Sequence, residues 1–144
     1  MPISNYPFTC LVPGSISRPM LPVCIINPHT GKSLCTWALI DTGADECALP
    51  AAYAERLGHT LHSGSAKQIS TGNGVTNAYA HTTRIDIFQI NGSGKVEPAA
   101  VYSIPDTPID FMPNLSTVLL GARNFLAGFI LTIDYPNQRF SLQK

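Results

Sequence analysis

Proline and glycine punctuate this chain from one end to the other, and that spacing limits what the chain can fold into. Its 144 residues include 12 prolines and 11 glycines. Both residue types interrupt helices, so short strands joined by turns are favoured over long helices. Hydrophobic residues make up 44 % of the chain, which is enough to build a core. The sequence therefore predicts one mainly β domain with one or two short helices.

Charge excludes several classes of partner. Charged residues make up only 12 % of the chain and the formal net charge is zero. This balance argues against disorder, and no basic patch or high pI indicates binding to nucleic acid. No apolar run is long enough to span a bilayer, and the first residues lack the pattern of a secretory signal. We therefore expect no nucleic-acid partner, no membrane association and a cytoplasmic location.

The four cysteines are Cys10, Cys24, Cys35 and Cys47, and none of them forms a C-x-x-C pair. That spacing disfavours a structural zinc site. Two disulfides are formally available, but a chain of this length can build a core without them. We expect reduced thiols, with Cys47 as a small buried apolar group, and no cofactor.

Histidine-based chemistry finds little support in the sequence. His59 and His62 form an H-x-x-H pair on a predicted loop, but no further ligand lies near them in the sequence. A Ser/His/Asp protease is disfavoured because the chain has no G-x-S-x-G turn. We expect no metal at this pair.

Turn signals divide the chain into segments. The Asn73-Gly74 pair predicts a hairpin tip, and Trp37 is expected in the core of a strand buried on both faces. The expected strands are 23–26, 33–40, 66–70, 75–80, 85–88, 118–120, 129–133 and 139–142. Helices are expected at 50–58 and 122–127, and a loop at 103–116. We divide the single domain into an N-terminal arm with the first strand, 1–32, and the main part, 33–144.

The segment Leu39-Ile40-Asp41-Thr42-Gly43-Ala44-Asp45 carries the chemistry. Asp41 directly follows an apolar strand, where an isolated carboxylate is costly to desolvate. Gly43 permits a tight turn and the close approach of another backbone. Asp, Thr and Gly also favour ordinary turns, so a plain turn is the competing interpretation of this tripeptide.

Three segments together resemble the retropepsins, the retroviral-type aspartic proteases and their cellular relatives. The segment 39–45 looks like the active-site motif, 69–75 resembles the glycine-tipped flap, and 118–126 is similar to the segment that crosses behind the active site. Ala122 is an additional residue before Arg123 compared with the viral pattern. The resemblance implies a closed β-barrel of the kind that forms half of an acid protease.

The resemblance also implies a role for each matched residue. Asp41 would be the catalytic acid and base, acting with its copy from a second chain, because this sequence has one Asp-Thr-Gly motif. Thr42, Gly43 and Arg123 would support the active site, with Arg123 paired to Asp45. The substrate-binding residues would be Ala44, Asp45, Thr71, Gly72, Asn73 and Gly74.

The predicted function is thus an aspartic endopeptidase, active as a homodimer on peptide or protein substrates. Two carboxylates about 3 Å apart share one proton, as the aspartic-protease dyad illustrates in general, and activate one water between them. One alternative is a catalytically silent domain of the same fold that binds peptides or serves as a regulatory domain. Another is a processing domain cut from a larger polyprotein.

Overall fold

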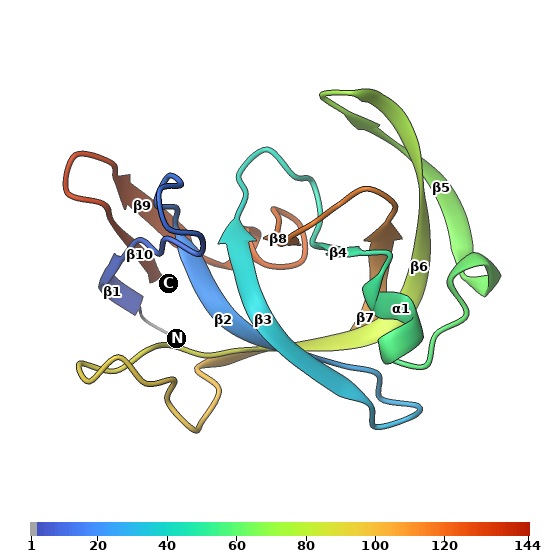
Figure 1. Ribbon diagram of the computed structural model, residues 1–144, viewed down its shortest axis with the longest axis horizontal. Helices are drawn as coiled ribbons and strands as arrows, with labels where there is room; N and C mark the ends of the chain where they lie inside the picture. Colours follow the sequence, from blue (N-terminus) through green and yellow to red (C-terminus); the bar gives the residue numbers. More distant parts are fainter. Residues whose placement is uncertain (1–2) are drawn as a thin grey trace.

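The computed structural model describes residues 3–144, which form a closed β-barrel and a small sheet beside it (Figure 1). The strands are β1 (Ile3–Pro7), β2 (Met20–Ile26), β3 (Ser33–Ile40), β4 (Ala48–Pro50), β5 (Ser65–Thr71), β6 (Gly74–Ile87), β7 (Tyr102–Met112), β8 (Val118–Leu120), β9 (Ile130–Asp134) and β10 (Arg139–Gln143). The helical segments are α1 (Tyr53–Arg56) and two 3-10 turns, η1 (Leu61–Ser63) and η2 (Leu126–Gly128). The predicted fold class, a mainly β barrel with short helices, is confirmed.

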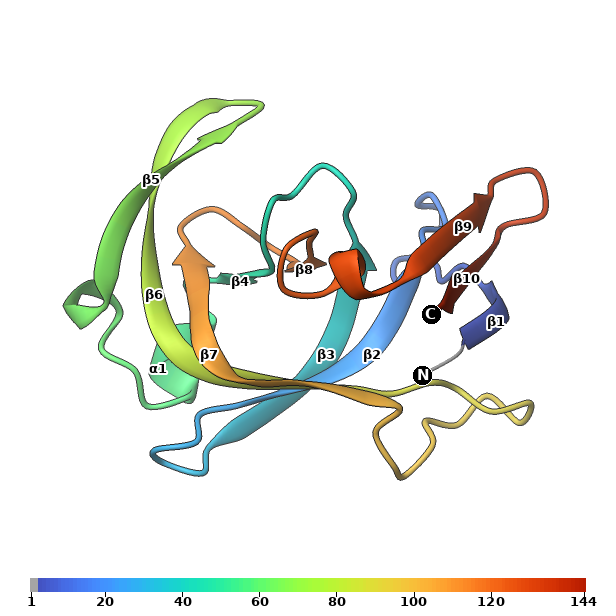
Figure 2. The ribbon, with the colours of Figure 1, turned by 180° about the vertical axis from the view of Figure 1, so that it is seen from behind.

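Six strands follow one another around the barrel in the order β2-β3-β8-β4-β7-β6, and β6 pairs again with β2 to close it. The β3–β8 and β4–β7 pairs are parallel, whereas the other pairs are antiparallel. Strand β5 pairs only with β6 and so continues the sheet outside the barrel. Figures 1 and 2 show the β5–β6 hairpin rising above the barrel, with its tip leaning toward the loop that follows β3.

The small sheet has the order β1-β10-β9 and joins the two ends of the chain. Tyr6 of β1 lies opposite Phe140 of β10, and their rings meet edge to face with centroids 5.5 Å apart. The Tyr6 hydroxyl also accepts a hydrogen bond from the backbone N–H of Ile90 at 2.9 Å. Both terminal strands therefore pair within one chain.

A single apolar cluster fills the barrel and continues under the small sheet. Phe111 from β7 and Leu21 from β2 are fully buried in it, and so is Phe140 from β10. Ile3, at the start of β1, is 1 % exposed and belongs to the same cluster. Residues of the predicted arm thus contribute to the common core. The division of the chain at residue 32 stays a prediction.

The expected loop at 103–116 is wrong, because most of that segment is strand β7. Prolines usually disrupt sheets by removing a backbone donor. Here Pro105 falls where the β6–β7 register shifts, and β4 pairs only with the later part of β7, Asp110–Met112. On one side, the proline-containing part of β7 is therefore a free edge, where the missing N–H breaks no ladder.

The strand that leads into the Asp41 loop is confirmed as β3, but it is not buried on both faces. Leu34 and Ala38 are buried, whereas Cys35 is exposed and Trp37 is half-buried. This alternation is that of a strand with one face toward the core. The placement of Trp37 in the core is therefore wrong.

The expectation of four reduced thiols is also wrong, because Cys24 and Cys35 form a disulfide. The antiparallel β2–β3 register sets these two residues directly opposite each other. Cys10 and Cys47 are free, and Cys47 is fully buried as expected. Since a disulfide is more typical of oxidising compartments, the cytoplasmic location stays a prediction. No helix in residues 3–144 is long and apolar enough to cross a membrane.

The remaining local predictions are mixed. Strands β5 and β6 confirm the predicted hairpin and extend beyond the expected ranges. The helix predicted at 50–58 is confirmed as the shorter α1, and Gly58 follows it with a φ of +78°, a conformation suited to glycine. The helix predicted at 122–127 is wrong, because only the 3-10 turn η2 forms there, and it begins at Leu126.

Candidate active site

Asp41 sits immediately after β3, at the point where the chain leaves the barrel. Its backbone N–H donates to the carbonyl of Leu120 at 3.1 Å, which ties the start of the loop to β8. The N–H of Gly43 donates to Asp41 Oδ1 at 2.9 Å, and the N–H of Ala44 donates to the Asp41 carbonyl at 3.3 Å. The first of these bonds is that of an Asx turn, so it fits both the catalytic and the plain-turn interpretation.

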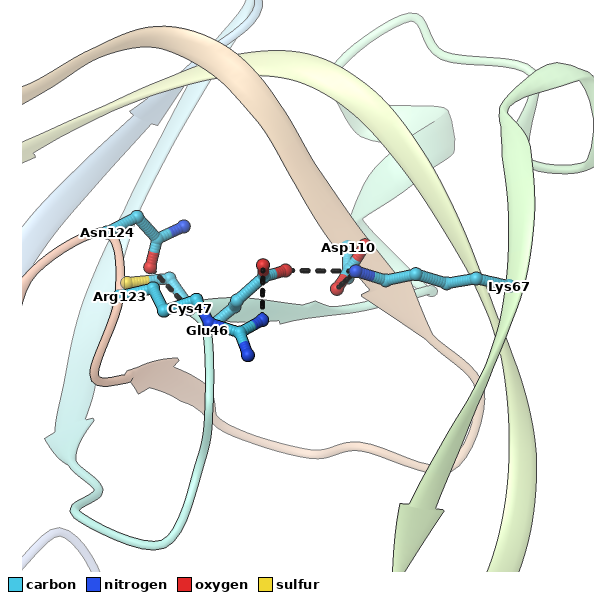
Figure 3. A network of polar contacts seen from close by, with 6 residues as sticks. All are labelled: Glu46, Cys47, Lys67, Asp110, Arg123 and Asn124. Atoms are coloured by element: carbon cyan, nitrogen blue, oxygen red, sulfur yellow. Dashed lines mark hydrogen bonds and ion pairs between the residues drawn. The ribbon is translucent and has the colours of Figure 1, made fainter.

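The segment after β8 crosses behind this loop and forms hydrogen bonds with its backbone. The N–H of Ala122 donates to the carbonyl of Ala44 at 2.9 Å, and the N–H of Arg123 donates to the carbonyl of Asp45 at 2.7 Å. Asn124 Oδ1 accepts the N–H of Cys47 at 2.7 Å (Figure 3). The loop that carries Asp41 is therefore fixed along most of its length by hydrogen bonds to its backbone.

Gly121 is the residue on which this close packing depends. A Cβ at this position would lie 2.8 Å from the carbonyl oxygen of Ala44 and closer still to the carbonyl of Glu46. Both neighbours are backbone atoms, so no side-chain rotation can make room. The N–H of Gly121 also donates to Cys47 Sγ at 3.4 Å. Burial raises the pKa of the Cys47 thiol to about 12, so this sulfur is a neutral packing group.

A cavity of about 700 Å³ opens between the Asp41 loop, the β5–β6 hairpin and the inner ends of β7 and β8. It is lined by Asp41, Gly43, Ala44, Asp45, Glu46, Ala48, Lys67, Gln68, Ile69, Ser70, Thr71, Gly72, Asp110, Met112, Leu119 and Arg123. Seven of the ten residues assigned from the sequence are in this set. Thr42, Asn73 and Gly74 are not in it, and all three are exposed. The roles assigned to all ten residues stay predictions.

The hairpin that covers the cavity is held by few contacts. Thr71 Oγ1 donates to the carbonyl of Gly74 at 2.9 Å and accepts the N–H of Asn73 at 3.2 Å, so the tip is closed by its own side chain. Ile69 packs on a small apolar cluster that includes Met112. Every other residue of β5 is exposed. A segment with so little burial is suited to opening and closing.

Arg123 does not make the predicted pair with Asp45. Its guanidinium Nη1 lies 3.5 Å from Glu46 Oε1 and its side chain is 73 % exposed, so this contact contributes little. The backbone N–H of Arg123 does reach Asp45, as described above. The additional Ala122 precedes Arg123 in the same turn.

Three charged residues of the cavity were missed by the sequence analysis: Glu46, Lys67 and Asp110. The Lys67 ammonium lies 2.9 Å from Glu46 Oε2 and 2.9 Å from Asp110 Oδ2 (Figure 3). Asp110 is 5 % exposed, between the buried Ile109 and Phe111. A carboxylate inside an apolar run is a signal that could have identified Asp110. The partners Glu46 and Lys67 carry no such signal.

Burial and charge act against each other at these groups. Burial raises the pKa of Asp110 above its usual range, and the neighbouring Glu46 adds to this, while Lys67 opposes it. The hydrogen bond from Lys67 lowers the pKa of Glu46. The Asp110 and Glu46 carboxylates in turn raise the pKa of Lys67. Lys67 is therefore charged, and its ammonium is the group that balances two acids.

The H-x-x-H pair lies away from the cavity. The ring of His59 stacks on that of His81 with centroids 4.5 Å apart, and the ring of His62 meets Tyr79 edge to face. Burial lowers the pKa of His59. No group of three or more metal-ligating side chains occurs within residues 3–144. These histidines therefore take part in aromatic packing.

Comparisons with known proteins identify the family of this chain. A search of curated proteins finds no match. Among solved structures, the chain is similar to a retropepsin-like aspartic protease from Rickettsia conorii, at 19 % identity and a TM-score of 0.49, over 87 % of this chain and 92 % of that one. The family model described as Aspartyl protease matches residues 24–123, more than half of the chain. This match includes the predicted active-site loop and hairpin and confirms the predicted family. The chain belongs to the aspartyl protease family.

Proposed function

We propose that this protein is an aspartic endopeptidase that works as a homodimer, with Asp41 from each chain at one shared site. The observation that carries the proposal is the position of Asp41, directly after β3 and in the wall of a cavity under a hairpin. The chain has one Asp-Thr-Gly motif, and this chemistry needs two carboxylates. A two-fold axis beside Asp41 supplies the second one.

The chemistry follows from the sharing of one proton between the two carboxylates. The ionised Asp41 accepts a proton from the water held between them, and the protonated one donates to the carbonyl oxygen of the peptide bond. The water oxygen thereby bonds to the carbonyl carbon and gives a tetrahedral diol. The carboxyl that took the water proton then gives it to the amide nitrogen and the other takes a proton from a diol hydroxyl, so that the C–N bond breaks and the amine leaves. The two pKa values of such a pair belong to the pair and not to either carboxylate.

The surrounding residues receive supporting roles in this proposal. Thr42 is exposed beside Asp41, where its hydroxyl can bond across the two-fold axis to the partner's loop. Gly43, Ala44 and Asp45 present backbone and carboxylate groups to an extended peptide. The hairpin tip, 71–74, covers the peptide and excludes water. Arg123 supports the loop through its backbone contact with Asp45.

One surface of the small sheet favours pairing with a second copy of the chain. Among the described strands, β9 pairs only with β10. One edge of the small sheet is therefore free to pair with a strand of another chain. Ile130 at the start of β9 is 67 % exposed, and Tyr135 just after it is 63 % exposed. An unpaired edge with apolar side chains is a typical place for strand pairing between chains.

Asp41→Asn tests the proposal directly. The change keeps the size of the side chain and the acceptor for the Gly43 N–H, but removes the acid from both halves of the site. We expect cleavage of an unstructured peptide library to fall at least about a hundredfold, since acid–base catalysis contributes on the order of 10² to 10⁴. Cleavage by the variant at the rate of the parent would refute the role of Asp41.

A mixing experiment tests the shared site. Adding an excess of the Asp41→Asn chain to the parent chain should suppress cleavage, because mixed dimers hold only one carboxylate. Adding the same amount of an unrelated protein is the control. Cleavage that is unchanged by the excess, with sedimentation showing active monomer, would contradict the dimer. If the parent binds peptides without cleaving them, the catalytically silent alternative is correct.

A further inference from the structure

Among the described residues, a buried carboxylate in the wall of the active-site cavity has its cationic partner on the covering hairpin. Asp110, near the end of β7, has a side chain that is 6 % exposed. Among the described residues, its one ion pair is with Lys67, which belongs to β5 of the hairpin. A buried anion requires a paired cation, because desolvation strongly penalises it alone. The cavity wall at Asp110 therefore needs a positive charge, and the hairpin provides it through Lys67.

The cation stands in the space through which a peptide would pass. Figure 3 shows the Lys67 side chain extended from β5 across to the carboxylates of Glu46 and Asp110. Glu46 lies in the Asp41 loop, Asp110 in β7, and all three residues line the same cavity as Asp41. The two carboxylates and the ammonium carry one surplus negative charge. Arg123 is 73 % exposed and 3.5 Å from Glu46, too distant and too solvated to cancel it.

Lys67 is free to leave this position. Its side chain is 45 % exposed, so its ammonium can turn into the surrounding water and be hydrated there. Its departure would leave Asp110 without a partner and Glu46 with only the remote Arg123. A lysine or arginine side chain of a bound peptide would restore the pair with the same chemistry, at the distance where Lys67 Nζ now lies. A neutral side chain would not, and an acidic one would add a third negative charge.

We propose that Asp110 is a specificity-determining residue, an inference that rests on the proposed peptidase function. Together with Glu46, it forms a subsite for a lysine or arginine side chain of the substrate. In the free protein, the Lys67 side chain occupies this subsite. The observation that points to a cationic ligand is that an ammonium already sits between these carboxylates, 2.9 Å from each. The raised pKa of Asp110 agrees with this view, since its carboxylate is short of positive partners.

The test uses sets of three peptides that differ at one position near the cleaved bond. The three carry lysine, norleucine, which has the same shape without the charge, or glutamate. At one position the parent should cleave the lysine peptide severalfold faster than the norleucine peptide, measured as kcat/KM, and the glutamate peptide most slowly. In Lys67→Met the lysine preference should increase by about tenfold, because the substrate becomes the only cation available to both acids.

Asp110→Asn should reduce the lysine preference at that position to less than about twofold, since a neutral amide gains little from an ammonium. The preference for the lysine peptide should therefore be largest in Lys67→Met, intermediate in the parent and smallest in Asp110→Asn. Equal preference in all three proteins, or a smaller preference in Lys67→Met than in the parent, would overturn the proposal. Glu46→Gln is a second variant on the exposed side of the subsite, and it should lower the preference in the same direction as Asp110→Asn.

Binding to Asp41→Asn separates this inference from the proposed function. Fluorescence polarisation with the same labelled peptides measures affinity without cleavage. A lysine preference in binding, lost in the Asp41→Asn, Asp110→Asn double variant, supports the subsite even if the parent proves inactive as a peptidase. Rapid cleavage with no charge preference in either assay refutes the subsite and leaves the peptidase intact. Matching thermal melting curves identify the variants that remain folded.

Discussion

Gly121→Ala is expected to destabilise the loop that carries Asp41, although it adds only one methyl group. The new Cβ would stand 2.8 Å from the Ala44 carbonyl oxygen and nearer still to the Glu46 carbonyl. Both are backbone atoms in a segment that is hydrogen-bonded on either side. Relief therefore requires β8 and the loop to move apart, since neither contact ends in a flexible side chain.

The magnitude follows from the bonds that such a movement would lengthen. The bonds from Ala122 N–H to Ala44 at 2.9 Å and from Arg123 N–H to Asp45 at 2.7 Å both cross this contact. Weakening two hydrogen bonds at about 1 kcal/mol each, with the strain of overpacking added, gives a loss of about 3 kcal/mol in the free energy of unfolding. Peptidase activity should fall with it, because the same movement displaces Asp41.

Urea unfolding followed by the fluorescence of Trp37, the single tryptophan, measures this loss. Gly128→Ala is the matched control, because a Cβ at Gly128 would meet no atom within 4 Å and its φ is not in the left-handed region. That variant should unfold within about 0.5 kcal/mol of the parent, as surface substitutions usually do. If Gly121→Ala matched the control, the argument from close backbone packing would be wrong.

Two further predictions concern stability. Replacing both Cys24 and Cys35 by alanine should lower the free energy of unfolding by up to about 3 kcal/mol, the loop-closure value for a sequence separation of 11. Urea unfolding of the parent protein with and without reductant should show the same loss. The control variant Cys10→Ala should show no loss. His59 has a pKa lowered by burial, so the unfolded chain binds its proton more readily. Stability should therefore fall as the pH drops below about 7 through the unfolded pKa of about 6.5. His59→Gln should flatten that part of the stability–pH curve, and an unchanged slope would show that another group is responsible.

The sequence by itself determined the parts of this protein that depend on neighbours along the chain. An apolar strand followed by Asp41 identified the loop, and Asn73-Gly74 identified the hairpin tip, since both signals rest on local backbone preferences. The segment 118–126, which includes Gly121, was identified by its resemblance to the retropepsins. These features were sufficient to predict the family, which the comparisons confirm.

Only the tertiary structure decided which distant residues meet. The register of β2 against β3 sets Cys24 opposite Cys35, and no composition rule specifies a register. Strand β7 tolerates its prolines because one of its edges is free there, a property of barrel topology. Asp110 lies beside Lys67 because the hairpin folds back over the barrel, which brings β5 and β7 to one cavity. Charges separated by tens of residues interact through space, so the sequence names the groups but not their partners.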